Sequence, residues 1–201
     1  MIAVIDYETG NLGSVSKALE SLGAKVKVTQ KSSDLKKADK IVLPGVGAFK
    51  DAMSALGNLG LIEPLKDAIA AKKPYLGICL GLELLFDESE EGGSSGGMGI
   101  LKGDVVKFRD PLLKVPHIGW NQLNKKRADC PLFKGINDDA FFYFVHSYYV
   151  RPRDKEIIAA VTDYGCDFTS MVWKDNIYAV QYHPEKSQQV GLKFLENFIR
   201  L

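Results

Sequence analysis

Residues 75–86 read YLGICLGLELLF, and this stretch decides the fold. An apolar strand pattern over residues 74–78 leads into the turn Gly77-Ile78-Cys79-Leu80-Gly81, and an apolar helix pattern over residues 80–86 begins at once. A sharp strand-to-helix turn with a reactive side chain at its apex is called a nucleophile elbow. The two glycines let the backbone turn sharply and leave room beside the reacting group.

Cys79 stands at the nucleophile position of this elbow. Its sulfur would project from a strand end at the N-terminus of a helix, where the helix dipole favours the thiolate, which is the reactive form. A buried cysteine in an α/β core is the plain alternative, and such cysteines are common. The flanking glycines at a strand-to-helix junction favour the nucleophile.

A base follows much later in the chain. His183 comes directly after the strand pattern of residues 177–182 and opens the sequence His183-Pro184-Glu185. A histidine at a strand end, with a carboxylate two residues on, can supply both a base and the group that orients it. Taken alone, His183 beside a solvated Glu185 favours no catalytic role. Together with Cys79, the two residues predict a Cys-His-Glu triad.

Strand and helix patterns alternate through the first half of the chain. We expect strands at residues 2–6, 25–29, 41–43 and 74–78, and helices at 11–22, 49–56, 62–71 and 80–86. This alternation predicts an α/β fold with a largely parallel, twisted sheet and helices on both faces. Ligands of such sheets bind at the carboxyl ends of the strands. Asp6, Pro44, Cys79 and His183 all fall at predicted strand ends.

The second half has strand patterns with few helices between them, at residues 100–108, 120–123, 141–145, 157–162, 169–173 and 177–182. They predict an antiparallel extension of the sheet. A final helix is expected at residues 187–200, with Val190, Phe194, Leu195 and Phe198 on one face. Residues 92–97, GGSSGG, are expected to form a mobile surface loop, for which a lid is a better role than phosphate binding. Neither a repeat nor a linker interrupts the chain, so residues 1–201 are interpreted as one domain.

The composition argues against several classes of protein. The 201 residues are 46% hydrophobic and 25% charged, an ordinary balance for a soluble domain. The net charge of +1 gives no support for nucleic-acid binding. No apolar run approaches the roughly 18 residues of a membrane span, and residues 1–6 enter a strand pattern without a signal peptide. Cys79, Cys130 and Cys166 lack metal or disulfide spacing, which suits the reducing cytoplasm.

An oxyanion site is expected beside Cys79. The backbone N–H of Leu80, the residue after the nucleophile, is the first donor expected. The second should come from the segment Pro44-Gly45-Val46-Gly47, which follows a predicted strand and would reach the same edge of the sheet. Without Cys79, this segment would be interpreted as a glycine-rich turn into a helix.

These motifs resemble those of class I glutamine amidotransferases. The shared segments are GICLG at residues 77–81, PGVG at 44–47 and HPEKS at 183–187. The segments PHIGWN at 116–121, YFVHSY at 143–148 and FDESEE at 86–91 narrow the resemblance to the glutaminase subunits of imidazole glycerol phosphate synthase, from histidine biosynthesis. The resemblance covers essentially the whole chain.

The resemblance implies that Cys79, His183 and Glu185 hydrolyse L-glutamine to glutamate and ammonia. It points to Val46, with Leu80, as the oxyanion donors. It implies that Glu91 binds the substrate α-ammonium and that the segment around His146 meets the amino-acid end. The implied substrate contacts are Gly45, Gly47, Glu83, Glu91, His146, Ser147 and Tyr148. Two of them also have structural interpretations, because Glu91 lies in an acidic run and His146 can be a satisfied histidine at a strand end.

Glu83 departs from the family, which usually has glutamine four residues after the nucleophile. A glutamate keeps the side-chain length but cannot donate a hydrogen bond when it is ionised. It would place a second carboxylate near the substrate ammonium, and a like charge near Cys79 would disfavour the thiolate. The reaction class is unaffected, but the details of substrate contact at this position are left open.

The resemblance also implies a partner. Such glutaminases form a heterodimer with a (β/α)8 cyclase, which receives the ammonia and makes imidazole glycerol phosphate and aminoimidazole-carboxamide ribotide. Asn11, Trp120 and Lys186 match positions at that interface, although a tryptophan is more often part of a core. The resemblance implies neither a cofactor nor a metal. It implies no nucleic-acid or membrane partner, and cytoplasmic localisation is expected.

Three other functions remain open on the sequence. The chain could be a class I glutaminase that serves another synthase, or a non-catalytic regulatory module of the same fold. It could also be a cysteine peptidase or esterase on a similar fold. The intact Cys79, His183 and Glu185 argue against the regulatory module, and turnover of glutamine rather than peptide or ester separates the last alternative.

Overall fold

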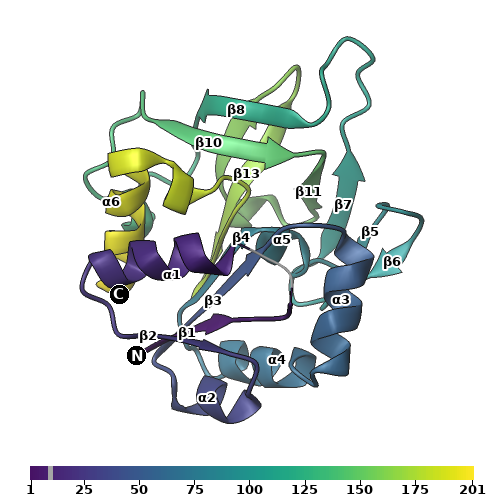
Figure 1. The fold of residues 1–201 in the computed structure, drawn as a ribbon. Coiled ribbons are helices and arrows are strands. Elements are labelled where there is room, and N and C mark those ends of the chain that lie inside the picture. Colours follow the sequence, from purple (N-terminus) through teal and green to yellow (C-terminus); the bar gives the residue numbers. More distant parts are fainter. Residues whose placement is uncertain (9–10) are drawn as a thin grey trace.

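The computed structural model describes residues 1–8 and 11–201 (Figure 1). Its centre is a run of parallel strands in the order β2-β1-β3-β4-β14. These strands are β1 (Ile2–Ile5), β2 (Val26–Thr29), β3 (Lys40–Gly45), β4 (Tyr75–Cys79) and β14 (Ile177–Val180). The predicted parallel sheet is confirmed, and its strands end on the side where the reactive residues were expected.

Beyond β14 the sheet continues as the predicted antiparallel extension, which begins with the pairs β14–β13, β13–β11 and β11–β7. Short strands complete this edge, and β12 pairs with β13 off the main path. The strands are β13 (Asp167–Lys174), β11 (Tyr148–Pro152), β7 (Gly103–Lys107), β5 (Glu88–Ser89), β6 (Ser95–Gly96), β12 (Ile158–Asp163) and β9 (Asn124–Lys125).

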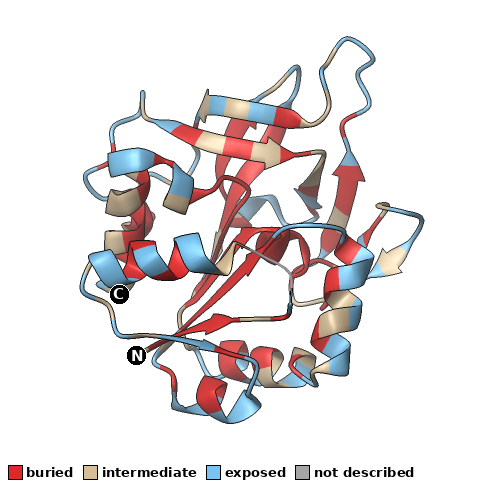
Figure 2. Ribbon diagram, viewed as in Figure 1, coloured by how far each residue is buried: buried red, intermediate tan, exposed pale blue. Residues whose placement is uncertain are grey.

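Helices cover both faces of the parallel strands, as the alternating patterns predicted. In β1, Ile2 and Val4 pack on one side with α1 (Leu12–Ser21) and α6 (Gln188–Ile199). Ala3 and Ile5 face the other side, with α2 (Ser32–Lys37), α3 (Phe49–Asn58) and α4 (Ile62–Ala70). The strands β1, β3, β4 and β14 between these layers are almost wholly buried, whereas the edge strand β2 is largely exposed (Figure 2). Burial on both faces is the reason that the buried strands read as continuous apolar runs.

A separate two-stranded ribbon consists of β8 (His117–Gln122) and β10 (Phe141–His146), paired antiparallel (Figure 1). Its side chains alternate between two faces because strand side chains have a period of two. The inward face carries His117, Phe142, Phe144 and His146, all of them buried. The outward face carries Ile118, Trp120, Phe141, Tyr143 and Val145, and we call these five residues the ribbon face.

Short elements complete the chain: α5 (Leu80–Glu83) and the 3-10 turns η1 (Pro131–Phe133), η2 (Lys155–Ile157) and η3 (Pro184–Lys186). The helix predicted over residues 80–86 is therefore a single turn. It ends early because residues 98–101 return and donate backbone hydrogen bonds to the carbonyls of Leu84, Leu85 and Phe86. No helix in the described part of the chain is long and apolar enough to cross a membrane.

Three further details differ from the sequence prediction. Helix α2 and strand β11 had no strong pattern of their own and were not expected. Residues 92–97 are not wholly a loop, because Ser95 and Gly96 pair with Glu88 and Ser89 to make a short hairpin. In the last helix Phe194, Leu195 and Phe198 are buried as predicted, whereas Val190 is only partly buried.

Candidate active site

Cys79 is the last residue of β4 and immediately precedes α5. Its backbone has φ 54° and ψ −109°, a region that residues with a side chain rarely occupy. Such strain persists where the surrounding structure fixes it, and it is the backbone feature of a nucleophile elbow. The sequence-predicted elbow is thus present in the backbone itself. Since α5 is a single turn, its dipole at Cys79 is smaller than that of the longer helix predicted.

The two glycines of the elbow are required by close backbone contacts. A Cβ atom on Gly77 would lie 2.4 Å from the carbonyl oxygen of Gly81, and one on Gly81 would lie 1.8 Å from that of Leu43. Both contacts are with backbone, which cannot move aside as a flexible side chain can. The glycines therefore allow β3, β4 and α5 to approach closely enough to present Cys79 at the sheet edge.

His183 reaches Cys79 because β14 lies next to β4 in the sheet, in parallel register with Val180 opposite Ile78. Its Nδ1 atom lies 2.8 Å from Oε1 of Glu185, and both side chains are buried. Because a carboxylate accepts hydrogen bonds, this contact places a proton on Nδ1, directed toward Glu185. Nε2 is then the nitrogen that can exchange a proton with the reacting groups. Among the described residues, Nε2 makes no hydrogen bond of ordinary geometry, although Cys79 is near enough to influence its charge.

The charge of His183 is set by opposing influences. Burial lowers the pKa of the imidazole, but the Cys79 thiolate and the Glu185 carboxylate outweigh burial and raise it to about 10. His183 is therefore favoured as the imidazolium beside Cys79. This is the ground state that a thiol nucleophile needs, because the proton is already on the group that must later deliver it.

The backbone of His183 is held by a clasp that the sequence reasoning did not identify. The His183 N–H donates to the carbonyl of Tyr143 at 2.9 Å, and the Tyr143 N–H donates to the Ser187 hydroxyl at 3.0 Å. That hydroxyl in turn donates to the His183 carbonyl at 2.7 Å, and Ser187 is fully buried. The base is therefore tied to β10. The only sequence signal was Ser187 at the end of the HPEKS segment.

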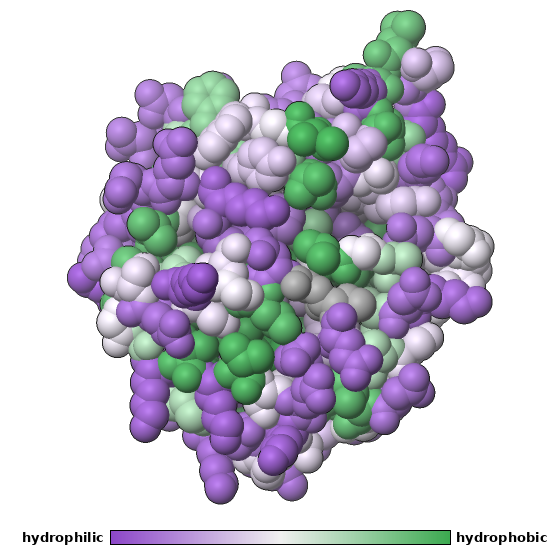
Figure 3. All heavy atoms as spheres, viewed as in Figure 1, coloured by the Kyte–Doolittle hydropathy of each residue, from purple (hydrophilic) through white to green (hydrophobic). Residues whose placement is uncertain are grey.

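A cavity of about 300 Å³ opens beside Cys79, within the range of small-molecule sites. Figure 3 shows a hollow in this face of the molecule with hydrophobic residues around it. The cavity brings together Cys79 and most of the predicted substrate contacts, while the predicted residues Gly45, Glu83, His183 and Glu185 lie outside its lining. The lining residues are Val46, Gly47, Cys79, Leu80, Glu91, Pro116, Val145, His146, Ser147 and Tyr148.

Val46, Gly47 and Ala48 form an exposed segment between β3 and α3, which we call the oxyanion loop. Gly47 has φ 98°, a conformation that favours glycine. The carboxylate of Glu91 lies at the far end of this loop, where its Oε2 accepts a hydrogen bond from the Phe49 N–H at 2.8 Å. The loop and Glu91 therefore line one cavity and are directly connected.

Glu83 is buried, and its recorded partner is Gln181, whose Nε2 donates to Oε1 at 2.8 Å. No lysine or arginine in the described residues forms an ion pair with it. Burial raises the pKa of Glu83 to about 8, and the Glu91 carboxylate adds to this against the hydrogen bond from Gln181. Glu83 is therefore mostly neutral at pH 7, which removes the second negative charge that the sequence suggested near Cys79.

His146 uses both ring nitrogens within the protein. Its Nδ1 lies 2.8 Å from the carbonyl oxygen of Tyr148, and its Nε2 lies 3.0 Å from Nδ1 of His117. Burial lowers the pKa of His117 to about 4 and that of His146 to about 3, so both rings are neutral at pH 7. Since the Tyr148 carbonyl only accepts, His146 carries its proton on Nδ1 and His117 donates to it. The imidazole of His146 thus holds the segment around Ser147 in place through the Tyr148 carbonyl. A ligand at this segment would bind its backbone groups and not the imidazole.

Two of the three residues predicted at a partner interface, Trp120 and Lys186, lie on and beside the ribbon face. The Trp120 ring packs edge-on against Tyr143 at 5.9 Å, and Lys186 Nζ lies 5.8 Å from the centre of the Tyr143 ring. Trp120, at 45% exposure, is not a core residue. The third, Asn11, contacts the carboxylate beside the base: its Nδ2 donates to Glu185 Oε1 at 3.5 Å. Tyr143 was missed by the sequence reasoning, although its alternation with buried Phe142 and Phe144 could have indicated it.

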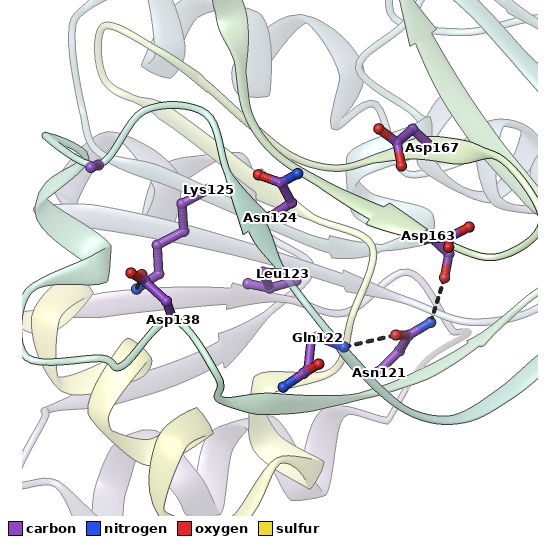
Figure 4. Close-up of a pocket in the computed structure, with 9 residues that line it drawn as sticks. Asn121, Gln122, Leu123, Asn124, Lys125, Asp138, Asp163 and Asp167 are labelled. Atoms are coloured by element: carbon purple, nitrogen blue, oxygen red, sulfur yellow. Dashed lines mark hydrogen bonds and ion pairs between the residues drawn. The ribbon is translucent and has the colours of Figure 1, made fainter.

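A larger cavity of about 630 Å³ lies along β8 and β9 (Figure 4). Its lining contains no cysteine, serine or histidine, and Lys125 is paired with Asp138 at 2.9 Å. Asn121 on its rim contacts the histidine pair, because its Nδ2 donates to the Asp163 carbonyl at 2.9 Å and approaches Nε2 of His117 at 3.4 Å. The larger cavity is therefore not the candidate for the chemistry.

Comparisons with known proteins agree with this geometry. Residues 3–201 match the family model described as glutamine amidotransferase class-I. The imidazole glycerol phosphate synthase subunit HisH 1 of Campylobacter jejuni is 53% identical, with 100% of both chains covered. The subunit HisH of Methanocaldococcus jannaschii is 50% identical, also with 100% of both chains covered.

Solved structures show the same fold at low identity. The crystal structure of a glutamine amidotransferase matches with a TM-score of 0.77 and 16% identity over 100% of both chains. The structure of PurLQS from Thermotoga maritima matches with a TM-score of 0.79 and 17% identity, covering 99% of this chain and 97% of that one. At such identities the likeness concerns the fold alone.

Proposed function

The chain belongs to the class I glutamine amidotransferase family, and we propose that it is the glutaminase subunit of an imidazole glycerol phosphate synthase. Relatives with that name match over the full length at about half identity. The observation that carries the proposal is Cys79 in a strained elbow beside a buried His183–Glu185 pair. These groups are what amide hydrolysis through a thiol requires.

In the proposed reaction, the Cys79 thiolate attacks the carboxamide carbon of L-glutamine and a tetrahedral oxyanion forms. The backbone N–H of Leu80 and that of Val46 donate hydrogen bonds to this oxyanion. The intermediate collapses as His183 passes its Nε2 proton to the leaving nitrogen, so ammonia departs and a thioester remains. His183 then removes a proton from water, which attacks the thioester and releases glutamate.

Glu185 keeps the imidazole oriented through Nδ1 during both steps, and it stabilises the positive charge on His183. The Ser187 clasp fixes the backbone of the same histidine. Glu91 lies in the cavity at the position proposed for the α-ammonium, while Gly47 and the segment 146–148 face the amino-acid end. Gly45 and Glu83 lie outside the cavity lining and act indirectly. Gly45 allows β3 to pack closely against α5, and Glu83 holds Gln181 through a hydrogen bond.

The proposed partner is a (β/α)8 cyclase that receives ammonia in a heterodimer and makes imidazole glycerol phosphate and aminoimidazole-carboxamide ribotide. The ribbon face supports a docking role, since Trp120, Ile118 and Phe141 are each about half exposed. Aromatic side chains of this kind are enriched at the centres of protein interfaces. Through the clasp at Tyr143, a partner on this face would act directly on His183. We place the complex in the cytoplasm, in keeping with three free cysteines.

The test replaces Cys79 with serine and measures two activities of the complex with the cyclase. Cys79→Ser should abolish synthesis that depends on glutamine but leave synthesis from added ammonium salt intact. Cys166→Ser, at an exposed cysteine, is the matched control and should retain both activities. Glutaminase activity near wild type in Cys79→Ser would contradict the nucleophile. Full activity with an unrelated synthase and none with the cyclase would contradict the proposed partner.

A further inference from the structure

Glu91 makes a contact that ammonium binding does not require. Its Oε2 accepts a hydrogen bond from the backbone N–H of Phe49, the first residue of α3, at 2.8 Å. The residue before it, Ala48, has no side-chain oxygen with which to cap the helix. Glu91 therefore supplies the missing N-terminal cap from a distant part of the chain, and its negative charge lies at the positive end of the helix dipole.

This cap lies at one end of the oxyanion loop. The other end is fixed, because Gly45 is buried and lies opposite Cys79 in the sheet register. Between these two anchors, Val46, Gly47 and Ala48 are exposed. The Ala48 carbonyl accepts the first hydrogen bond of α3, from the Ala52 N–H at 3.1 Å, so the loop enters the helix at this residue. The position of the Val46 N–H thus depends on where Phe49 is held.

Glu91 is itself held on the opposite wall. Its backbone N–H donates to the Ser89 hydroxyl at 3.2 Å, and Ser89 is buried in β5. While Oε2 is bonded to Phe49, the second oxygen, Oε1, accepts no hydrogen bond from the described residues. The carboxylate can therefore bind a cation from the cavity through Oε1 without leaving the helix.

We propose that Glu91 is a positioning residue for the oxyanion loop as well as the ligand of the substrate ammonium. This inference rests on the proposed glutaminase function. One carboxylate then connects the amino-acid end of the substrate to the donor that acts on its amide end. Because coupling between two sites is reciprocal, a loop held in the productive position also favours binding of the ammonium.

Two substitutions and two substrates separate these roles. Glu91→Gln retains an oxygen that can accept from Phe49 but loses the charge, whereas Glu91→Leu loses both. L-glutamine carries the α-ammonium, and glutaramate has the same amide chain without it. Ammonia release is measured for each pair in the complex with the cyclase. Glu88→Leu, an exposed carboxylate on the same hairpin, is the matched control.

With L-glutamine, both variants should show a raised KM. With glutaramate, Glu91→Gln should retain kcat/KM within about threefold of wild type, while Glu91→Leu should lose about tenfold, which corresponds to about 1.4 kcal/mol. That loss is of the size measured for a helix cap. Equal activity of Glu91→Leu and wild type on glutaramate would overturn the proposal and leave Glu91 as an ammonium ligand only.

Amide hydrogen exchange gives a second readout that needs no turnover. The Phe49 amide should exchange faster in Glu91→Leu than in wild type or Glu91→Gln, and unchanged exchange would overturn the proposal. Thermal unfolding of each variant shows whether the fold is intact. If the wild-type complex releases no ammonia from L-glutamine, the proposed function fails. If the wild-type complex does release ammonia but Glu91→Leu and wild type have equal kcat/KM on glutaramate, only this inference fails.

Discussion

Replacing Glu83 with glutamine should stabilise the protein, and the gain should grow with pH. The pKa of Glu83 is raised by burial from 4.5 to about 8. Between these values the folded protein holds a proton that the unfolded chain has released. Stability therefore falls as pH rises through this interval, by about 1.4 kcal/mol per pH unit. Glutamine has nearly the same shape and accepts the same hydrogen bond from Gln181, but it does not titrate.

The loss of stability follows from the interval between the two pKa values of Glu83, which are 4.5 in the unfolded chain and about 8 in the folded protein. Relative to Glu83→Gln, the wild type should lose less than about 1 kcal/mol at pH 5, roughly 3 kcal/mol at pH 7 and up to about 5 kcal/mol above pH 8. Below about pH 4 the difference should vanish because the carboxyl is protonated in both states. The reaction itself should be preserved, because the substitution keeps a polar group of the same length behind Cys79.

Urea unfolding of both proteins at pH 5, 6, 7 and 8 measures this difference directly. Glu88→Gln, at an exposed carboxyl, controls for the loss of one charge. A difference between wild type and Glu83→Gln that stays constant from pH 5 to pH 8 would refute the reasoning. A fall of more than about tenfold in glutaminase kcat/KM, or about 1.4 kcal/mol, would show that the Glu83 carboxyl has become part of the site in this chain.

Four further predictions concern this site and the ribbon face beside it. Trp120→Ala and Lys186→Ala should weaken binding of the cyclase in titrations without lowering the melting temperature, whereas a large loss of stability at unchanged affinity would make Trp120 a core residue. Ser187→Ala should lower glutaminase kcat and destabilise the fold by roughly 1–3 kcal/mol, because it orphans a buried backbone N–H; an unchanged kcat would remove the clasp from the mechanism. His117→Phe keeps the ring between Phe144 and Tyr164 but loses its hydrogen bonds, so the KM for glutamine should rise with kcat nearly constant. The wild-type pH profile from pH 6 to 9 should carry no titration of His117, since its pKa is lowered to about 4 by burial.

The sequence by itself determined the elbow and the main architecture. Cys79 between two glycines at a strand-to-helix junction, with His183-Pro184-Glu185 after a strand, predicted a nucleophile, a base and the carboxylate that orients it. These signals are local: a period of two or 3.6 residues and a glycine at a tight turn are properties of a few neighbouring residues. For the same reason the parallel strands, the antiparallel extension and the last helix were predicted near their observed positions.

Only the tertiary structure decided how these groups act on one another. Glutamate is normally ionised at pH 7, but burial of Glu83 beside Gln181 keeps it mostly neutral. Ser187 and Tyr143 hold His183 because η3 packs against β10, and Glu91 caps α3 because the hairpin at β5 lies beside it. Burial and hydrogen-bond partners depend on which distant strands become neighbours. That is fixed by the packing of the whole chain, and no local pattern contains it.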